Sequence, residues 1–407
     1  MAKLNQIIED DQAFDTLVEQ SNQIEEACQK FRALMKEQLD RAAAIKAQGS
    51  FTDYAGLNTI TVGLCGGDGI GPVIMAETRR IADELLRGEI ASGKIALKDI
   101  QGLTLENRQQ AGKAIPDDVL AELKTCDAIL KGPTTTPQKG QAGPNIESAN
   151  VAMRKELDLF ANLRPVKVPE LGIDWTFFRE NTEGAYAVGS KGFEVSPDLC
   201  VDFTIVTDEG CRRIIQAAFD FAVKNGKTMV TAVTKANIIK TTDGKFLDIF
   251  HEIGAKYPDI VKDERYIDIQ TANLINERNR SNFQVMVLPN LYGDILTDEA
   301  AQIQGGVGTA GSANIGKRYA MFEAIHGSGD RMVAEGRANY ANPASILRAL
   351  AMLLSHIGYQ RKADELDRAL DICLIEEKKV TVTGHADGAT CREFGDYLLE
   401  TLKKAAR

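Results

Sequence analysis

The pattern of apolar and polar positions divides the chain into an N-terminal segment and a long remainder. Residues 3–47 are polar and favour helix, with apolar side chains at roughly helical spacing, so we expect a helical extension there. We interpret it as a helix pair packed on the protein's own surface, with an oligomerisation arm as the alternative. From Thr59 onward, short β-rich runs such as TITVGLC alternate with longer helical runs such as PVIMAETRRIADELL. This alternation predicts an α/β sheet with helices on both faces.

Some later elements follow from the same pattern. The run FQVMVL, residues 283–288, is typical of an apolar strand, and NLYGDILTDEAAQ directly after it is typical of a helix. Helices are also expected at about 343–357, 361–372 and 392–404.

Composition and charge narrow the classes of partner. The 407 residues are 44% hydrophobic and 26% charged, which is typical of a globular protein, and the net charge is −10. An acidic protein of this kind is not expected to bind nucleic acid or an anionic membrane as its main partner, and an anionic substrate needs a dedicated arginine cluster.

Cysteines and targeting signals bear on the compartment. Seven cysteines are scattered singly without a CxxC pair, which favours a reducing compartment. The chain has no run of about 18 apolar residues, so no membrane span is expected. The N-terminus resembles neither a signal peptide nor a transit peptide, and we therefore expect a cytoplasmic protein.

Two glycine-containing segments are candidates for cofactor or phosphate contact. GGDGIGP, residues 66–72, follows a predicted strand and opens a helix, but it does not match the full dinucleotide-binding fingerprint. A simple tight turn is the alternative. KGPTTTP, residues 131–137, lies at the end of another predicted strand, where α/β sheets bind ligands.

Polar side chains in and after ESANVAMRKELDLFANLRPVK, residues 147–167, suggest a carboxylate site. Asn150 and Arg154 share a helix face, and Ser148 lies in the first turn, where its hydroxyl and free backbone N–H groups can receive an anion. Arg164 and Arg179 follow. Surface salt bridges would explain any one arginine, but together they are typical of a clamp for a polycarboxylate, since a guanidinium binds a carboxylate through two parallel hydrogen bonds.

Other residues could transfer protons or bind a metal. Tyr186 and Lys235 suit proton transfer, since a lysine ammonium can lower the pKa of a tyrosine. Asp294 and Asp298 are hard oxygen ligands four residues apart, suited to Mg²⁺ or Mn²⁺, with an acidic first helix turn as the alternative. His326 lies in a glycine-flanked loop, and no pair of histidines has zinc-like spacing.

The order of the motifs along the chain resembles a known family. The motifs are GDGIGP, KGPTTTP, SANVAMRKELDLFANLRPVK, FRENTEGAY, TKANI, NLYGDILTDEAAQ, GSANIG, FEAIHGS and ANPASILRALAMLLSHIG. As an ordered set they resemble the isocitrate and isopropylmalate dehydrogenase family over residues 60–400, nearly the whole chain except the extension.

The resemblance implies a fold and an activity. It implies a family-specific α/β fold, not a Rossmann fold, with a large cofactor-binding domain at 59–159 and 306–407. It also implies a smaller α/β domain at 160–305 with a clasp near 184–207, so that 1–58 is the extension. The implied activity is metal-dependent oxidation of a 2-hydroxy acid by hydride transfer to a nicotinamide cofactor, followed by loss of the β-carboxylate as CO₂. The implied assembly is a homodimer or higher with shared active sites.

The resemblance also implies roles for single residues. Arg154, Arg164 and Arg179 resemble the clamp for the α- and β-carboxylates. Tyr186 resembles the acid that protonates the enol, and Lys235, from the other subunit, its partner in proton transfer. Asp294 and Asp298 resemble the Mg²⁺ or Mn²⁺ ligands. The implied cofactor contacts are Lys131, Thr135, Asn237, His326, Gly327, Asp330 and Asn342.

Substrate choice is expected to depend on the helix that begins near Ser148. Isocitrate members of the family resemble SANVAMR, in which Ser148 and Asn150 can hydrogen-bond the γ-carboxylate, whereas isopropylmalate members have apolar residues there. Because an unpaired buried polar group discriminates strongly, isocitrate, a tricarboxylate, is favoured. Homoisocitrate and 3-isopropylmalate are the alternatives.

The chain departs from the family's pattern at two places. The family's third metal carboxylate, supplied across the dimer, falls on Gln270, so metal binding is weaker or Asp268 substitutes. A catalytically silent regulatory subunit is therefore a further alternative. In the cofactor loop, Asp330 suits the ribose of NAD, whereas Arg331 suits the phosphate of NADP. NAD is favoured, since the segment around Gly384 lacks the Tyr and Arg of bacterial NADP-type members.

Overall fold

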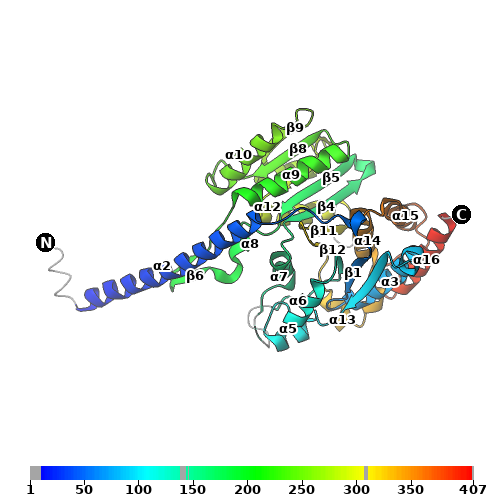
Figure 1. Ribbon diagram of the computed structural model, residues 1–407, viewed down its shortest axis with the longest axis horizontal. Coiled ribbons are helices and arrows are strands. Elements are labelled where there is room, and N and C mark those ends of the chain that lie inside the picture. Colours follow the sequence, from blue (N-terminus) through cyan, green and yellow to red (C-terminus); the bar gives the residue numbers. More distant parts are fainter. Residues whose placement is uncertain (1–10, 138–143, 145, 307–309, 406–407) are drawn as a thin grey trace.

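The protein is described by a computed structural model that covers residues 11–137, 144, 146–306 and 310–405 (Figure 1). Within these residues the strands form a ten-stranded sheet, in the order β2-β1-β3-β12-β11-β4-β5-β10-β8-β9, and a separate pair, β6 and β7. The strands are β1 Ile60–Cys65, β2 Ile95–Ile100, β3 Ala128–Lys131, β4 Ala161–Val168, β5 Ile173–Glu180, β6 Phe193–Ser196, β7 Leu199–Val201, β8 Met229–Thr234, β9 Val261–Tyr266, β10 Val285–Leu288, β11 Gly311–Ile315 and β12 Ala320–Ala324.

The helices alternate with these strands, as the sequence predicts. They are α2 Asp11–Lys46, α3 Gly71–Leu85, α4 Arg87–Ala91, α5 Leu105–Ala111, α6 Asp117–Leu123, α7 Ala149–Glu156, α8 Ala185–Val188, α9 Asp208–Lys224, α10 Thr242–Gly254, α11 Ile267–Ile275, α12 Asn290–Ile303, α13 Asp330–Ala334, α14 Ala344–His356, α15 Gln360–Asp371 and α16 Cys391–Ala405. The helices predicted near 343–357, 361–372 and 392–404 are thus confirmed. None of the described helices is long and apolar enough to cross a membrane.

The sheet has two parallel halves joined by an antiparallel centre. β2, β1, β3 and β12 run parallel in one half, and β5, β10, β8 and β9 run parallel in the other. Between them, β11 pairs antiparallel with β12 and β4, and β4 pairs antiparallel with β5. One sheet contains strands of both expected domains, 59–159 with 306–407 and 160–305. The division into two domains therefore stays a prediction.

Helices cover both faces of this sheet, because alternate strand residues point to opposite sides. On β10, Val285 and Val287 pack with α9 and α10, whereas Met286 and Leu288 pack with α11 and α12. In the other half, one core includes α3, α14, α15 and α16, and a second core includes α6 and α7. The α/β class predicted from the sequence is therefore confirmed.

The N-terminal extension differs from its prediction. It is one 36-residue helix, α2, and not a helix pair. In Figure 1 its N-terminal half, drawn in dark blue, extends beyond the rest of the fold, and its middle lies beside β6. Residues 11–46 contain no Gly or Pro, and nothing in that segment interrupts the helix.

Candidate active site

Ten of the residues singled out from the sequence line one cavity of about 280 Å³. They are Ser148, Asn150, Arg154, Arg164, Arg179, Tyr186, Asp294, Asp298, His326 and Gly327. The cavity lies where the antiparallel centre of the sheet meets α7 and α12, so it draws residues from both halves of the chain.

The sheet register explains why two of the arginines converge. Arg164 lies on β4 and Arg179 on β5, and these adjacent strands bring both side chains toward α12. On α12, Asp294 and Asp298 are four residues apart and share a face. Gly293 allows the close approach, because a Cβ atom there would lie 2.5 Å from the Arg179 side chain.

Arg179 is the most buried of the three arginines, at 1% exposed. It donates to the side-chain oxygen of Asn290 through Nη2 at 2.7 Å, and its Nη1 is paired with Asp294. The Tyr186 hydroxyl donates to the other oxygen of Asp294 at 2.7 Å. Asp294 therefore links Arg179 to Tyr186.

Arg164 is held from three sides and reaches the second carboxylate. Its Nε donates to Asn162 at 2.9 Å, and its Nη1 donates to Thr297 at 2.5 Å and to Asp298 at 3.0 Å. The Asp298 side chain is 63% exposed. This arrangement fixes the guanidinium while leaving the carboxylate open to a ligand.

A buried carboxylate, Glu323 on β12, holds the third arginine. Its two oxygens lie 3.4 Å from Arg154 Nη2 and 3.4 Å from Lys131 Nζ. Asn314 also donates to it at 2.8 Å. The Nε of Arg154 is buried and has no hydrogen-bond partner in the described residues, so this guanidinium has donor capacity left for an anion.

The charges of the cavity favour a bound anion. Burial and the neighbouring Arg154 lower the pKa of Arg179 to about 9, and the same two causes lower the pKa of Arg164. Positive charges that disfavour one another are stabilised when a polycarboxylate binds between them. The cavity is thus built to take negative charge.

Tyr186 stays protonated and Asp294 stays ionised. Burial, together with Asp294, raises the pKa of Tyr186 above its usual value. Burial opposes the ionisation of Asp294, but Arg179 and the Tyr186 hydroxyl outweigh it, so the pKa of Asp294 is lowered. The tyrosine is therefore a hydrogen-bond donor next to a permanent carboxylate.

The first turn of α7 presents polar groups to the cavity. Ser148 is the N-cap residue of α7, but its side chain makes no capping hydrogen bond to the helix. Asn150 accepts a hydrogen bond from Thr134 at 3.2 Å. The Ser148 hydroxyl and the amide of Asn150 are thus placed to meet a substituent of a ligand.

A second group of predicted residues meets at the carboxyl ends of β1, β3 and β12. Thr135 donates to Ser328 at 2.8 Å and lies 3.1 Å from Asp330. The GDGIGP loop touches the same place, since the Ile70 N–H donates to the carbonyl of Ser328. Gly69 has a φ of +60°, and a Cβ there would lie 2.0 Å from the Ser328 carbonyl, so glycine is required.

The other predicted cofactor contacts are spread more widely. His326 Nε2 is buried and has no hydrogen-bond partner among the residues that the structure describes, and burial lowers the pKa of His326, so the ring is neutral. Asn342 accepts from the Ala344 N–H at the start of α14. Lys131 is fully buried against Glu323 and does not line the cavity, and Asn237 lies exposed after β8. Only part of the predicted cofactor set is therefore brought together here.

Lys235 and its neighbours lie outside the cavity. Lys235 Nζ pairs with Asp268 at 2.7 Å, and the Asp268 side chain is 68% exposed. Gln270 is fully buried, and its amide contacts Met286 and Asn273. Gln270 is thus buried within its own chain, whereas the nearby Asp268 carboxylate is exposed.

Two residues that hold the site together, Asp68 and Glu323, were missed by sequence reasoning. Asp68 ties three segments together by accepting from the N–H groups of Leu105 and Thr135 at 2.7 and 2.8 Å and from Arg108 at 3.2 Å. Glu323 was missed because its strand is uniformly buried, so no polar face marks it. A charged residue inside an apolar strand, as in AMFEA, is the signal that could have found it.

Two carboxylates alone provide an incomplete metal site. In the described part of the chain, no group of three or more His, Cys, Asp or Glu side chains could hold a metal ion. Asp294 and Asp298 are hard oxygen donors at the open side of the cavity, and Mg²⁺ takes few protein carboxylates and keeps several waters. The donor set fits a divalent cation completed by other ligands.

Residues 61–398 match the model of the isocitrate/isopropylmalate dehydrogenase family. The chain belongs to this family. Members of this family are dehydrogenases, so the protein is a dehydrogenase. Family members use NAD or NADP and a divalent metal, and they act on small molecules.

Relatives within the family differ in substrate. The chain is 36% identical to a homoisocitrate dehydrogenase of Methanocaldococcus jannaschii, over 83% of this chain and 96% of that protein. It is 38% identical to an isocitrate dehydrogenase [NADP] of Rickettsia prowazekii, over 74% of this chain but only 61% of that longer protein. The crystal structure of isocitrate dehydrogenase from Methylococcus capsulatus aligns with a TM-score of 0.73 and 32% identity, over 85% of this chain and all of that one.

Proposed function

We propose that the protein oxidises isocitrate to 2-oxoglutarate and CO₂ with transfer of a hydride to NAD. The observation that carries this proposal is one cavity in which three guanidinium groups, a protonated tyrosine and two helix-borne carboxylates converge. The likeness to isocitrate and homoisocitrate dehydrogenases supports the reaction type.

In this proposal the three arginines bind and orient the substrate. Arg154, with its unpartnered Nε, and the two guanidiniums of Arg164 and Arg179 would hold the α- and β-carboxylates through paired hydrogen bonds. Binding there removes the mutual repulsion of the three positive groups. It also fixes the carboxylate that leaves as CO₂, which lowers the entropic part of the barrier.

Asp294 and Asp298 would hold Mg²⁺ or Mn²⁺, together with ligands from the substrate, from water and from a second chain. When bound, the cation supplies Lewis-acid stabilisation of negative charge on the substrate's hydroxyl-derived oxygen. The ion pairs to Arg164 and Arg179 keep both carboxylates turned toward the cavity.

Tyr186 would supply the proton that completes the reaction. After loss of CO₂, the substrate carbon needs a proton, and the Tyr186 hydroxyl is held at the cavity wall with its pKa raised. Lys235 would restore that proton from a second chain, because in its own chain it does not line the cavity and pairs with Asp268.

An exposed apolar surface near Lys235 supports the homodimer. Exposed apolar side chains follow Lys235 in the chain and also lie on α11 and α12: Ile238, Ile269, Ile275, Leu291 and Ile295. In this proposal they form one apolar surface, which is typical of a protein–protein interface. A second copy seated there would bring Lys235 and Asp268 toward the partner's cavity.

The nicotinamide cofactor would lie at the carboxyl ends of β1, β3 and β12. Asp330, held by Thr135, would accept from a ribose hydroxyl, which favours NAD over the bulkier, negative 2′-phosphate of NADP. When bound, the cofactor accepts the hydride from the substrate.

Substrate choice would rest on Ser148 and Asn150. Both can hydrogen-bond a γ-carboxylate, as isocitrate provides, and homoisocitrate, with one more methylene, is the second candidate because of the relative named above. The test is to measure kcat/KM of the purified chain for isocitrate, homoisocitrate and 3-isopropylmalate under identical conditions. Isocitrate should rank first. A first rank for either of the others overturns the substrate assignment, and no turnover of any of them favours a silent subunit.

A further inference from the structure

The helix α2 carries a row of apolar side chains that remain largely exposed to solvent. Val18, Ile24, Phe31 and Leu39 are 43%, 59%, 41% and 72% exposed. At about 100° per residue, Ile24, Phe31 and Leu39 fall within an arc of about 80° around α2, and Val18 lies about 60° beyond Leu39. Ile24, Phe31 and Leu39 therefore share one side of the helix, with Val18 at its edge. The match to the family begins at residue 61, so this helix lies outside it.

Other side chains of α2 attach it to the body of the protein. Leu34, Gln38 and Ile45 are buried, and Arg41 donates to the buried Glu183 at 2.9 Å. The spacing of these residues places them on a different side of the helix from Leu39. Ile24 and Leu39 are thus left exposed after α2 has docked, and Phe31, whose ring contacts Phe203, lies at the border between the docked side and the exposed side.

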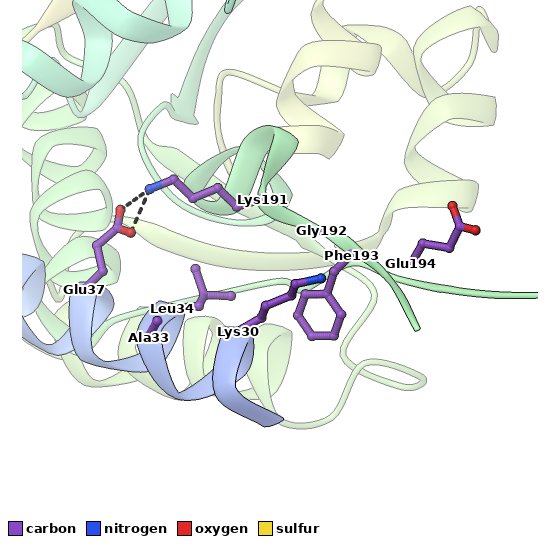
Figure 2. A pocket seen from close by; sticks show the side chains of 8 residues that line it. All are labelled: Lys30, Ala33, Leu34, Glu37, Lys191, Gly192, Phe193 and Glu194. Atoms are coloured by element: carbon purple, nitrogen blue, oxygen red, sulfur yellow. Dashed lines mark hydrogen bonds and ion pairs between the residues drawn. The ribbon is translucent and has the colours of Figure 1, made fainter. Parts of the chain in front are cut away.

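The hairpin formed by β6 and β7, together with the residues on either side of it, contacts the middle of the helix. Figure 2 shows the side of α2 with Lys30, Leu34 and Glu37 facing the segment 191–194 across a groove of about 520 Å³. Lys191 pairs with Glu37 at 2.5 Å, and the ring of Phe31 lies 5.2 Å from that of Phe203. These contacts fix the direction in which α2 projects.

The charges of α2 are divided between its two halves. Residues 11–26 contain five acidic side chains and no basic one, for a net charge of −5. Residues 27–46 contain five basic and two acidic side chains, for a net charge of +3. Two such helices side by side attract each other when antiparallel, whereas in parallel each half meets a like charge.

The apolar row is also nearly symmetric about Cys28 along the sequence of α2. Ile24 and Phe31 lie four and three residues from Cys28, and Val18 and Leu39 lie ten and eleven residues from it. An axis of two-fold symmetry at Cys28 would therefore place Ile24 against Phe31 of the partner subunit. An isologous contact needs a self-complementary surface of this kind.

We propose that α2 binds α2 of a second copy of this chain, antiparallel and crossing near Cys28. The apolar row forms the centre of the contact, and each acidic half lies along a basic half. At this crossing Glu25 lies beside Arg32 of the partner subunit. No residue of the cavity takes part, so the inference does not depend on the proposed reaction.

Disulfide trapping of the full-length protein tests the proposal. Cys28 and Cys200 are the exposed cysteines, so Cys200→Ser leaves Cys28 as the accessible thiol. Mild oxidation with copper phenanthroline in air should join two chains through Cys28. Leu39→Glu should slow this about tenfold, and Ala44→Glu, an equal charge change on the other side of α2, should not. No covalent dimer, or a Leu39→Glu variant that forms it at the same rate, overturns the proposal.

A charge exchange tests the antiparallel orientation. In the same Cys200→Ser background, Glu25→Arg alone and Arg32→Glu alone should each lose most self-trapping, because like charges then meet twice at the crossing. A mixture of the two variants should regain it, as a dimer of one chain of each, which mass spectrometry identifies. Self-trapping of Glu25→Arg at the wild-type rate, or no recovery in the mixture, contradicts the orientation.

Discussion

Asp298→Asn should separate metal-dependent catalysis from stability. The Asp298 side chain is 63% exposed and makes one ion pair, to Arg164 at 3.0 Å. An exposed ion pair is worth below about 1 kcal/mol, so the free energy of unfolding should change little. Arg164 keeps its bonds to Asn162 and Thr297, so the guanidinium stays in place.

The effect on metal binding should be much larger. Asparagine is nearly isosteric with aspartate and keeps an oxygen ligand, but it removes one negative charge beside a divalent cation. At an effective dielectric constant of about 20, a unit charge pair at about 4 Å is worth about 4 kcal/mol. Water that solvates the cation recovers part of this Coulomb energy, which leaves a loss of about 3 kcal/mol. That loss corresponds to roughly a hundredfold weaker metal binding.

The assay is reduction of NAD with isocitrate while Mn²⁺ is titrated, with thermal unfolding in EDTA measured on the same samples. Glu299→Gln is the matched control, since Glu299 is the next residue of α12 and does not line the cavity. Asp298→Asn should need about a hundredfold more Mn²⁺ for half-maximal rate, with an unchanged melting temperature, and Glu299→Gln should need no more Mn²⁺ than the wild type. An unchanged Mn²⁺ requirement would refute the metal assignment.

Three further predictions follow from the same contacts. Tyr186→Phe removes the donor to Asp294 and should lower kcat about a hundredfold or more, with isocitrate binding measured by calorimetry nearly unchanged; an unaffected kcat would exclude Tyr186 as the acid. Ser148→Ala should raise the KM for isocitrate about tenfold and leave that for 3-isopropylmalate unchanged, and equal effects on both would argue against a γ-carboxylate contact. Burial beside Glu183 raises the pKa of Glu180 to about 7, above its unfolded value of 4.5, so its contribution to stability is lost as pH rises through about 7. The melting temperature of Glu180→Gln relative to wild type should therefore rise from about pH 5 to about pH 8, and a fall would contradict the assignment.

Local patterns predicted the cavity because its residues lie in short motifs with defined neighbours. Asp294 and Asp298 share a face by helical spacing, and Ser148 and Asn150 share the first turns of α7, so spacing alone places them. Arg164 also lines the cavity, but its position depends on the pairing of β4 with β5, which follows from the order of strands in the sheet.

Other features could not be predicted because they depend on packing between distant segments. The resemblance to the family placed the third metal ligand on Gln270, but only the packing of α11 against β10 shows that this side chain is buried and that Asp268 is exposed. The extension was expected to fold back as a pair, since apolar spacing marks a helix without marking whether it continues. Glu323 lies in a strand that is apolar around it, and its value as a counter-ion depends on Lys131 from β3.

The most direct test of the central claim is the rate of nicotinamide reduction by the purified chain with isocitrate and Mn²⁺, comparing NAD, NADP and an EDTA control. The account predicts reduction of NAD that exceeds that of NADP and stops in EDTA. Folded protein that binds isocitrate but reduces neither cofactor would contradict it.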